Sequence, residues 1–208
     1  AAHAKIKNID ITKALKSDGV AAIYTGADIA ADGVGGPICG WTPTNRDGSA
    51  PKEPPHPLLA NGKVRYVGDH IAVVIAESME QAKLAAENVK IDLEALAPVV
   101  DLSTAIGNTQ IHDEMDDNVY FDWELGDEKA TADALGSAAK VIELTVTNNR
   151  VIPNAMEPRA AVAEYDETSE SYTLYTSSQN PHLTRLVMAA FMMQIPESKL
   201  HVVAPDVG

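Results

Sequence analysis

The sequence predicts an α/β (α+β) fold, and three observations carry this prediction. Residues 4–24 have the order strand, helix, strand, and residues 71–94 repeat that order. Residues 161–176 contain two β-prone runs joined by a polar turn, which is typical of a hairpin. A hydrophobic fraction of 45% and a charged fraction of 22% are close to the averages of globular proteins, which excludes collagenous, disordered and coiled-coil classes.

Alternating apolar and polar side chains, followed by turn residues, predict the first strand-helix-strand unit. Residues 4–9 alternate apolar and polar or basic side chains, which predicts a strand with one face in water. Asp10 is expected to cap a short helix over 11–16. Asp18-Gly19 then turns the chain into an apolar strand at 20–24.

The second unit begins with a continuous apolar run at 71–76, which predicts a strand buried on both faces. Ser78 and Gln81 have the spacing of a capping box, so a helix is expected over 78–88. Residues 90–94 alternate as another strand. We expect 20–24, 71–76 and 91–93 to form one buried sheet with this helix packed on it.

Two irregular segments separate and follow these units. Residues 33–57 hold six of the twelve prolines and predict a long loop that lies on the surface and docks against another part of the protein or a partner. Gly33-Val34-Gly35-Gly36 is followed by Pro37, so we interpret it as loop and not as a phosphate-binding turn. Residues 107–128 form an acidic segment with eight Asp and Glu residues within 113–128.

The last third is expected to contain strands and one strong helix. In order we expect a helix near 131–138, strands at 141–147, 161–165 and 172–176, a helix opened by Asn180-Pro181, and a strand at 200–203. The expected apolar stripe of the later helix consists of Leu183, Leu186, Val187, Ala190 and Phe191, with Pro196 ending it. Met188, Met192 and Met193 are expected to fill the core, and a flexible wall beside a cofactor is the alternative.

Charge, hydropathy and cysteine count disfavour several kinds of binding partner and location. Sixteen Lys and Arg against thirty Asp and Glu give a net charge of −14, which disfavours nucleic acid and anionic membrane surfaces as partners. No apolar stretch approaches the ~18 residues of a transmembrane helix, so no membrane insertion is expected. The single cysteine, Cys39, favours a reducing, cytoplasmic location. The chain starts without Met or a signal peptide, and we expect it to be processed or incompletely covered.

Metal and ion-pair hypotheses are weak. The six histidines show no zinc-type spacing. The cluster at 112–117 has ligands for a hard cation but lacks the pattern of a calcium loop, so a solvated acidic loop is favoured. Glu157 and Arg159 stand in an apolar stretch, where a structural ion pair is the favoured interpretation and support for a substrate channel the alternative.

The segment 177–181 joins an expected strand to an expected helix. Such junctions carry binding sites in α/β proteins, so the amide of Gln179 could face a ligand. The alternative is that Ser178 and Asn180 only cap the helix.

Four motifs resemble one family in the same order along nearly the whole chain. They are KEPPHP (52–57) with GKVRYVGD (62–69), NRVIPNAMEPRAAVAEY (149–165), TSSQNPH (176–182) and APDVG (204–208). The chain resembles the molybdopterin-binding large subunit of the xanthine dehydrogenase, aldehyde oxidase and carbon monoxide dehydrogenase family. The resemblance is nearest to the carbon-monoxide-dehydrogenase-like branch.

The resemblance implies a domain order and a cofactor site. Residues 1–106 would form an α/β hammerhead domain, 107–138 an acidic connecting segment, and 139–208 the beginning of the molybdenum-cofactor-binding domain, truncated at Gly208. Gln179 matches a glutamine that hydrogen-bonds an oxo ligand of molybdenum, and Gly208 matches the first glycine of a loop beside the cofactor. The cofactor would be molybdenum-molybdopterin, in the cytosine dinucleotide form in some relatives.

The resemblance also implies an activity. The family oxidises aldehydes, purines, N-heterocycles or carbon monoxide with water-derived oxygen, and all four substrate classes stay open here. Electrons leave through [2Fe-2S] and FAD centres on partner subunits, and the remainder of the large subunit is a further partner. The chain by itself, without residues beyond Gly208, is expected to be inactive. The alternative is a non-catalytic binding or assembly domain that docks partner subunits through its proline-rich loop.

Overall fold

A computed structural model describes residues 1–207 and contains three small sheets with short helices beside them. The strands are β1 (Ala4–Asp10), β2 (Val20–Thr25), β3 (Lys63–Val64), β4 (Ala72–Ala76), β5 (Lys90–Ala95), β6 (Ala161–Asp166), β7 (Ser171–Thr176) and β8 (Leu200–Val203). The helices are α1 (Gly26–Ala31), α2 (Met79–Ala86), α3 (Glu128–Ser137) and α4 (Pro181–Leu186), with the 3₁₀ turns η1 (Ala14–Lys16), η2 (Leu102–Thr104) and η4 (Glu197–Lys199) and the π-helix η3 (Val187–Met193). None of the helices in residues 1–207 is both long and apolar enough to cross a membrane.

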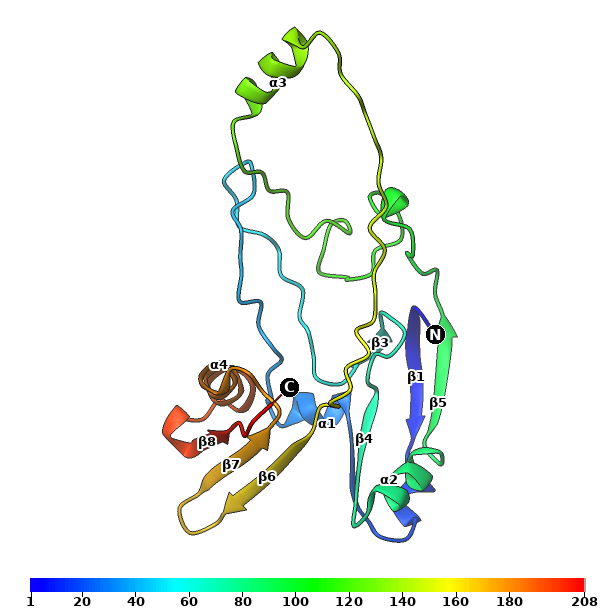
Figure 1. Ribbon diagram of the computed structural model, residues 1–208. Coiled ribbons are helices and arrows are strands. Elements are labelled where there is room, and N and C mark those ends of the chain that lie inside the picture. The colour runs from blue at the N-terminus through cyan, green and yellow to red at the C-terminus, as the bar shows by residue number, and fades with distance from the viewer. Residues whose placement is uncertain (208) are drawn as a thin grey trace.

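The first half of the chain forms two sheets that stand next to each other (Figure 1). One has the strand order β3-β1-β5, and the other pairs β2 with β4, both antiparallel. A salt bridge joins β1 and β5: Lys7 Nζ on β1 lies 3.0 Å from Glu94 Oε2 on β5. The core of the three-stranded sheet is the cluster of Ala4, Ala60 and Val64.

The expectation of one buried sheet in this half is wrong. The strand at 90–95 pairs with β1 and not with β2 or β4, because two strands with one wet face each match one another. The apolar run at 71–76 is also not buried on both faces. Val73 and Ile75 are 43% and 46% exposed, since β4 lies in a two-stranded sheet and only one of its faces is half-buried.

The local signals of this half are largely confirmed. Ser78 Oγ accepts a hydrogen bond from the Gln81 N–H and opens α2, which packs on β4. Gly19 has φ +70° in the expected turn. Asp10 Oδ1 accepts from Thr12 N at 2.9 Å, but the helix that follows is only a 3₁₀ turn at Ala14–Lys16.

The second half is built on the sheet β6-β7-β8. β6 and β7 form the expected hairpin, with Ala161 opposite Thr176 and Asp166 opposite Ser171. β8 lies parallel to β7, and α4 with η3 is the connection between them. Leu174, Ala189 and Leu200 form the core of this unit.

The expected apolar stripe on the helix after Asn180 is wrong for four of its five residues, because Leu183, Leu186, Ala190 and Phe191 are exposed and only Val187 is half-buried. Leu183 and Phe191 are 53% and 42% exposed, whereas Met188 and Met193 pack on the core beside Ala189. For Ala190 and Phe191 the physical reason is that Val187–Met193 is a π-helix, whose i to i+5 bonds rotate the side chains away from the 3.6-residue period. The expectation of core methionines is confirmed for Met188 and Met193, whereas Met192 is half-buried and is not among the side chains packed on this cluster.

The chain between β5 and β6, residues 96–160, forms a long and mostly irregular connection. α3 lies at the end of this connection that is farthest from the sheets (Figure 1). The helix expected near 131–138 is confirmed as α3, with Asp127 Oδ1 accepting from Ala130 N. The strand expected at 141–147 is wrong: these residues belong to no sheet of the described chain. An apolar alternation forms a strand only where another strand supplies hydrogen bonds.

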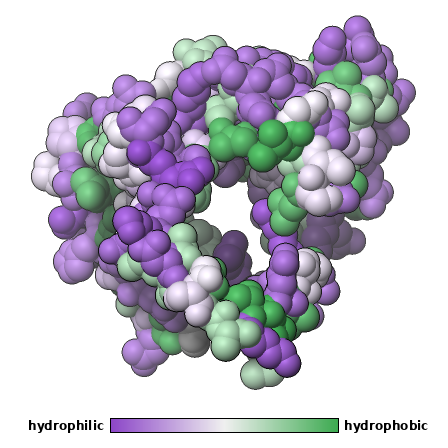
Figure 2. Space-filling model, turned by 90° about the horizontal axis from the view of Figure 1, so that it is seen from above, coloured by the Kyte–Doolittle hydropathy of each residue, from purple (hydrophilic) through white to green (hydrophobic). Residues whose placement is uncertain are grey.

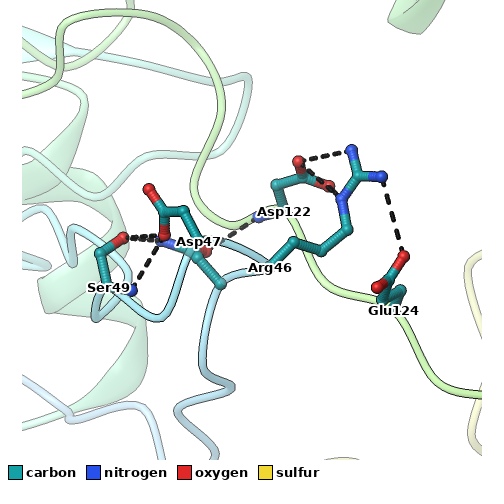
Figure 3. A network of polar contacts seen from close by, with 6 residues as sticks. Arg46, Asp47, Ser49, Asp122 and Glu124 are labelled. Carbon is teal, nitrogen blue, oxygen red and sulfur yellow. Dashed lines mark hydrogen bonds and ion pairs between the residues drawn. The ribbon is translucent and has the colours of Figure 1, made fainter.

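The loop at 33–57 is confirmed as irregular, and it docks on the acidic segment of the same chain. Arg46 holds the Asp122 carboxylate through both Nε (3.0 Å) and Nη2 (2.8 Å), and its Nη1 lies 3.8 Å from Glu124 (Figure 3). Trp41 packs edge-on against Phe121 and Trp123 with ring centroids 5.6 and 5.7 Å apart. The loop therefore has an intramolecular partner.

The start of the same loop contacts the second half of the chain. Gly35 N donates to Met192 O at 2.8 Å, and Gln194 Nε2 donates to Gly33 O at 2.7 Å. A Cβ on Gly35 would lie 2.1 Å from the carbonyl oxygen of Phe191. Only glycine allows the two backbones to approach so closely.

We predict that Gly35→Ala destabilises the chain by about 1–3 kcal/mol, because the added methyl group forces two backbone segments apart. Gly40→Ala is the matched control, since a Cβ there meets nothing within 4 Å. Thermal denaturation followed by circular dichroism compares the two variants. Equal melting temperatures would show that the Gly35 contact does not hold the halves together.

Candidate functional site

The candidate site lies at the edge of the C-terminal sheet where two parallel strands end. Tyr175 of β7 is opposite Val203 of β8, so the strands finish side by side. The segments 177–180 and 204–207 leave from these ends, on the side of the sheet toward α1 (Figure 1). Carboxyl ends of parallel strands are where open α/β sheets bind ligands.

Several hydrogen bonds hold the backbone of the β7-to-α4 junction. Ser177 is tied to Ala160 in both directions, through its N–H (3.3 Å) and its hydroxyl (3.2 Å). Ser178 Oγ accepts from Asn180 N and contacts the hydroxyl of Thr184 at 3.0 Å. Asn180 Oδ1 accepts from Leu183 N at 3.2 Å, which confirms it as the cap.

Gln179 lies at the centre of this turn and is exposed, as is Asn180. Its neighbours Ser178 and Asn180 act as caps, so the capping hypothesis explains those two residues but not Gln179. The segment 204–207 leaves the neighbouring strand at the same edge. Gly208, the other expected cofactor residue, lies outside the described residues.

An amide at the end of β7 and a turn at the end of β8 suit a bound cofactor. A side-chain amide offers two donors and an acceptor and does not titrate. The hydrogen bonds of Ser177 and Ser178 hold the neighbouring backbone in place, so the Gln179 amide is already positioned for a ligand. The residues present therefore fit a cofactor placed at this edge.

Two family profiles match the sequence, one on each half. The profile of the aldehyde oxidase and xanthine dehydrogenase a/b hammerhead domain matches residues 1–97. The profile of the molybdopterin cofactor-binding domain matches residues 111–208, which include the β7-to-α4 junction. The chain belongs to the xanthine dehydrogenase and aldehyde oxidase family. Its second half is the part that matches the cofactor-binding domain of that family.

Individual family members match the whole chain. It is 33% identical to the carbon monoxide dehydrogenase large chain of Afipia carboxidovorans, over 100% of this chain and 26% of the relative. It is 32% identical to the nicotine 6-hydroxylase large subunit of Paenarthrobacter nicotinovorans, over 100% and 25%. Quinoline 2-oxidoreductase from Pseudomonas putida 86 superposes with a TM-score of 0.82 at 33% identity, over 100% and 25%. The chain thus spans about a quarter of the length of these relatives.

The acidic cluster at 112–117 is a solvent-exposed loop held by lysines. Asp113 Oδ1 lies 2.6 Å from Lys63 Nζ on β3, and Asp116 pairs with Lys52 of the proline-rich loop. Asp117 accepts from the Asn118 N–H. Among residues 1–207 no group of three His, Cys, Asp or Glu side chains could hold a metal ion.

The premise that Glu157 and Arg159 are buried is wrong. Both residues are exposed, as are all residues from 139 to 160. The apolar neighbours that suggested burial are themselves in water: Val151, Ile152 and Met156 are 83%, 85% and 101% exposed.

Sequence reasoning missed two groups of residues that hold the fold around the site. Gly35 and Gly36 were interpreted as plain loop, but a Cβ on Gly36 would lie 1.9 Å from the His56 carbonyl oxygen. The adjacent glycines before a proline were the available signal for close backbone approach. Arg46 was missed because its partners Asp122 and Glu124 are far away in sequence, with Asp122 76 residues after Arg46.

His112, at the start of the acidic cluster 112–117, has a side chain whose pKa is lowered. Its Nδ1 is buried and has no hydrogen-bond partner among the described residues. Desolvation, followed by the nearby Arg65 guanidinium, lowers its pKa from the usual 6.5, and His56 acts in the same direction. The carboxylates of Glu114 and Asp113 oppose the shift of the His112 pKa only partly.

This lowered pKa predicts a pH dependence of stability. Above the unfolded-state pKa of 6.5, His112 is neutral in both states. As the pH falls below that value the unfolded chain takes up the proton first, so stability is lost as the pH falls through the folded-state pKa. Melting temperatures at pH 7.5 and 5.5 should therefore differ less in His112→Gln than in the wild type. An unchanged difference would contradict the assignment to His112.

Proposed function

We propose that the chain is part of the large subunit of a molybdenum hydroxylase, and that Gln179 contacts its cofactor. The observation that carries the proposal is the geometry of one edge: an exposed amide in a rigid turn after β7, beside the turn after its parallel neighbour β8. The match of residues 111–208 to the molybdopterin cofactor-binding domain supports this placement. Gly208 would extend the second turn toward the same group.

The chain's own residues would bind and orient the cofactor. The Gln179 amide would donate a hydrogen bond to it without taking up or releasing a proton. Ser177, Ser178 and Asn180 hold the backbone on either side of Gln179, so little reorganisation is needed when the bond forms. The bound molybdenum-molybdopterin supplies the redox chemistry that amino-acid side chains lack.

The remaining features of the proposal come from the family. We assign 1–106 to the hammerhead domain, 107–138 to a connecting segment and 139–208 to the beginning of the cofactor domain. The cofactor would be of the molybdopterin type, with a cytosine dinucleotide form possible in this branch, and electrons would pass to [2Fe-2S] and FAD centres on partner subunits. A lone exposed cysteine in 207 described residues suits a reducing, cytoplasmic site of action.

The substrate would be a small molecule oxidised with oxygen from water. The names of the relatives include carbon monoxide, nicotine and quinoline, at identities of 33%, 32% and 33%. Because these identities differ by only one percentage point, the proposal keeps carbon monoxide, N-heterocycles, aldehydes and purines as substrate classes.

A non-catalytic docking domain is the weaker candidate. Its main support was the proline-rich loop, which was expected to be available to a partner. In the structure Arg46, Trp41 and Gly35 of this loop are engaged with other parts of the same chain.

In the complete enzyme we predict that Gln179→Ala lowers turnover by ~10²-fold while leaving molybdenum content and melting temperature nearly unchanged. The reason is that the lost donor acts at the reacting centre and the residue is exposed in the chain. Turnover, metal content and melting temperature are measured on the same preparation.

Asn180→Ala is the matched neighbouring control for that prediction. It removes the cap on Leu183 N and should cost about 1 kcal/mol of stability with little direct effect on turnover. Full activity of Gln179→Ala at full molybdenum occupancy would show that Gln179 is only part of the scaffold.

A further inference from the structure

The pair Asn61-Gly62 occurs once in the sequence and is the only asparagine followed by glycine. It forms the bend that leads into β3, and Gly62 has φ +74°, in the left-handed region that glycine adopts without steric cost. Both residues are exposed, and a Cβ on Gly62 would meet nothing within 4 Å. The bend is therefore open to solvent.

The reactive groups of this pair are free of hydrogen bonds. Within residues 1–207, neither the Asn61 side chain nor the Gly62 N–H has a hydrogen-bond partner. The amide of Asn118 is engaged by contrast, since Oδ1 accepts from Ile111 N at 3.1 Å and Nδ2 donates to Ala105 O at 2.9 Å. The Asn61 side-chain carbon and the nitrogen of the next residue are thus free to approach each other.

Solvent reaches much of this molecule. The space-filling view from above shows an opening between segments of the chain (Figure 2). No large side chain is fully buried in the part of the chain that the structure describes. An exposed bend in such an open molecule is in contact with water and hydroxide.

We propose that Asn61 is a site of spontaneous deamidation. The Gly62 nitrogen, after losing its proton to hydroxide, attacks Cγ of Asn61, and a C–N bond forms while the bond from Cγ to the amide nitrogen breaks. That nitrogen takes a proton from water and leaves as ammonia, and a succinimide ring remains. Glycine favours the attack because it has no Cβ to shield its nitrogen.

Water then opens the ring at one of its two carbonyl groups, and no atom is oxidised or reduced. Addition of water at Cγ breaks the bond from Cγ to the ring nitrogen and gives an ordinary aspartate. Addition at the backbone carbonyl breaks the original peptide bond and gives isoaspartate, in which the chain continues through Cβ and Cγ. The first product changes only the charge, whereas the second also lengthens the backbone by one methylene group.

The position of the bend gives the backbone change a structural consequence. Ala60 and Val64, on either side of it, are 2% and 3% exposed and pack with Ala4 in the core of the three-stranded sheet. Gly62 O accepts a hydrogen bond from Ile6 N at 2.9 Å, which ties the bend to β1. A longer backbone between two core residues displaces the Gly62 carbonyl, because the pairing register of a strand is set by the number of backbone atoms before it.

Ageing the complete polypeptide that contains this chain at mildly alkaline pH, followed by peptide mass spectrometry, tests the site. We expect Asn61 to lose its amide nitrogen at a rate within about 10-fold of the rate in the same polypeptide unfolded in guanidinium chloride, because no part of the fold has to open first. Asn118 is the internal control and should be protected by folding, since its amide is engaged. A folded-state rate for Asn61 more than about 100-fold below the unfolded rate would overturn the proposal.

Asn61→Gln is the matched control for the chemistry. The side chain of Asn61 is exposed and has no hydrogen-bond partner within residues 1–207, so the substitution leaves the fold unchanged. The longer side chain must close a larger and less favourable ring, and the mass change of the peptide that contains residue 61 should disappear. A mass change that persists in this variant would overturn the assignment to Asn61.

Amide hydrogen exchange at Ile6 separates the effect of the backbone from the effect of the charge. In the fraction of the aged polypeptide that carries isoaspartate, we expect the Ile6 amide to exchange about 10-fold faster, because its acceptor Gly62 O is displaced. Asn61→Asp has the same charge with a normal backbone and should leave this exchange at the rate of the unaged polypeptide. Equal rates at Ile6 in the isoaspartate fraction and in Asn61→Asp would overturn the inferred effect on β1.

Discussion

The backbone contact between Gly35 and the end of the π-helix η3 is the constraint on which the rest of the structure depends. Each sheet has only two or three strands, and no large side chain is fully buried among residues 1–207. Such small sheets are marginal alone. The Gly35 N to Met192 O bond, the Gln194 to Gly33 bond and the Arg46 to Asp122 pair connect the N-terminal sheets, the acidic segment and the C-terminal sheet. They thereby fix where the β7–β8 edge stands.

The sequence predicted those parts of the fold that are decided locally. The hairpin of β6 and β7, the Ser78 and Asn180 caps and the loop at 33–57 all follow from turn and capping chemistry within a few residues. Partner choice between strands was not predictable in the same way. The run at 71–76 is wholly apolar and the run at 141–147 alternates apolar with polar residues, so both predict strands, but only the former finds a partner strand here. Which strands pair in a sheet depends on residues far away in sequence, and the apolar pattern of one strand does not identify its partner.

The candidate site was predictable only in part for a related reason. Its turn was visible because Asn180-Pro181 is a strong helix start, and the structure adds that β8 ends beside it. That parallel pairing joins Tyr175 to Val203 and could not be derived from either strand alone. The period of η3 was also hidden, since nothing in residues 187–193 distinguishes a π-helix from an α-helix by composition.

The central claim is that the β7–β8 edge belongs to a molybdenum-cofactor site that this chain forms together with further polypeptide. Metal analysis of the complete polypeptide and of the 208-residue chain, purified side by side, tests it most directly. The account predicts stoichiometric molybdenum with an extractable pterin in the complete polypeptide and no bound molybdenum in the chain alone, because Gln179 and its turn offer too few contacts by themselves. A folded complete polypeptide without molybdenum, or stoichiometric molybdenum in the chain alone, would contradict it.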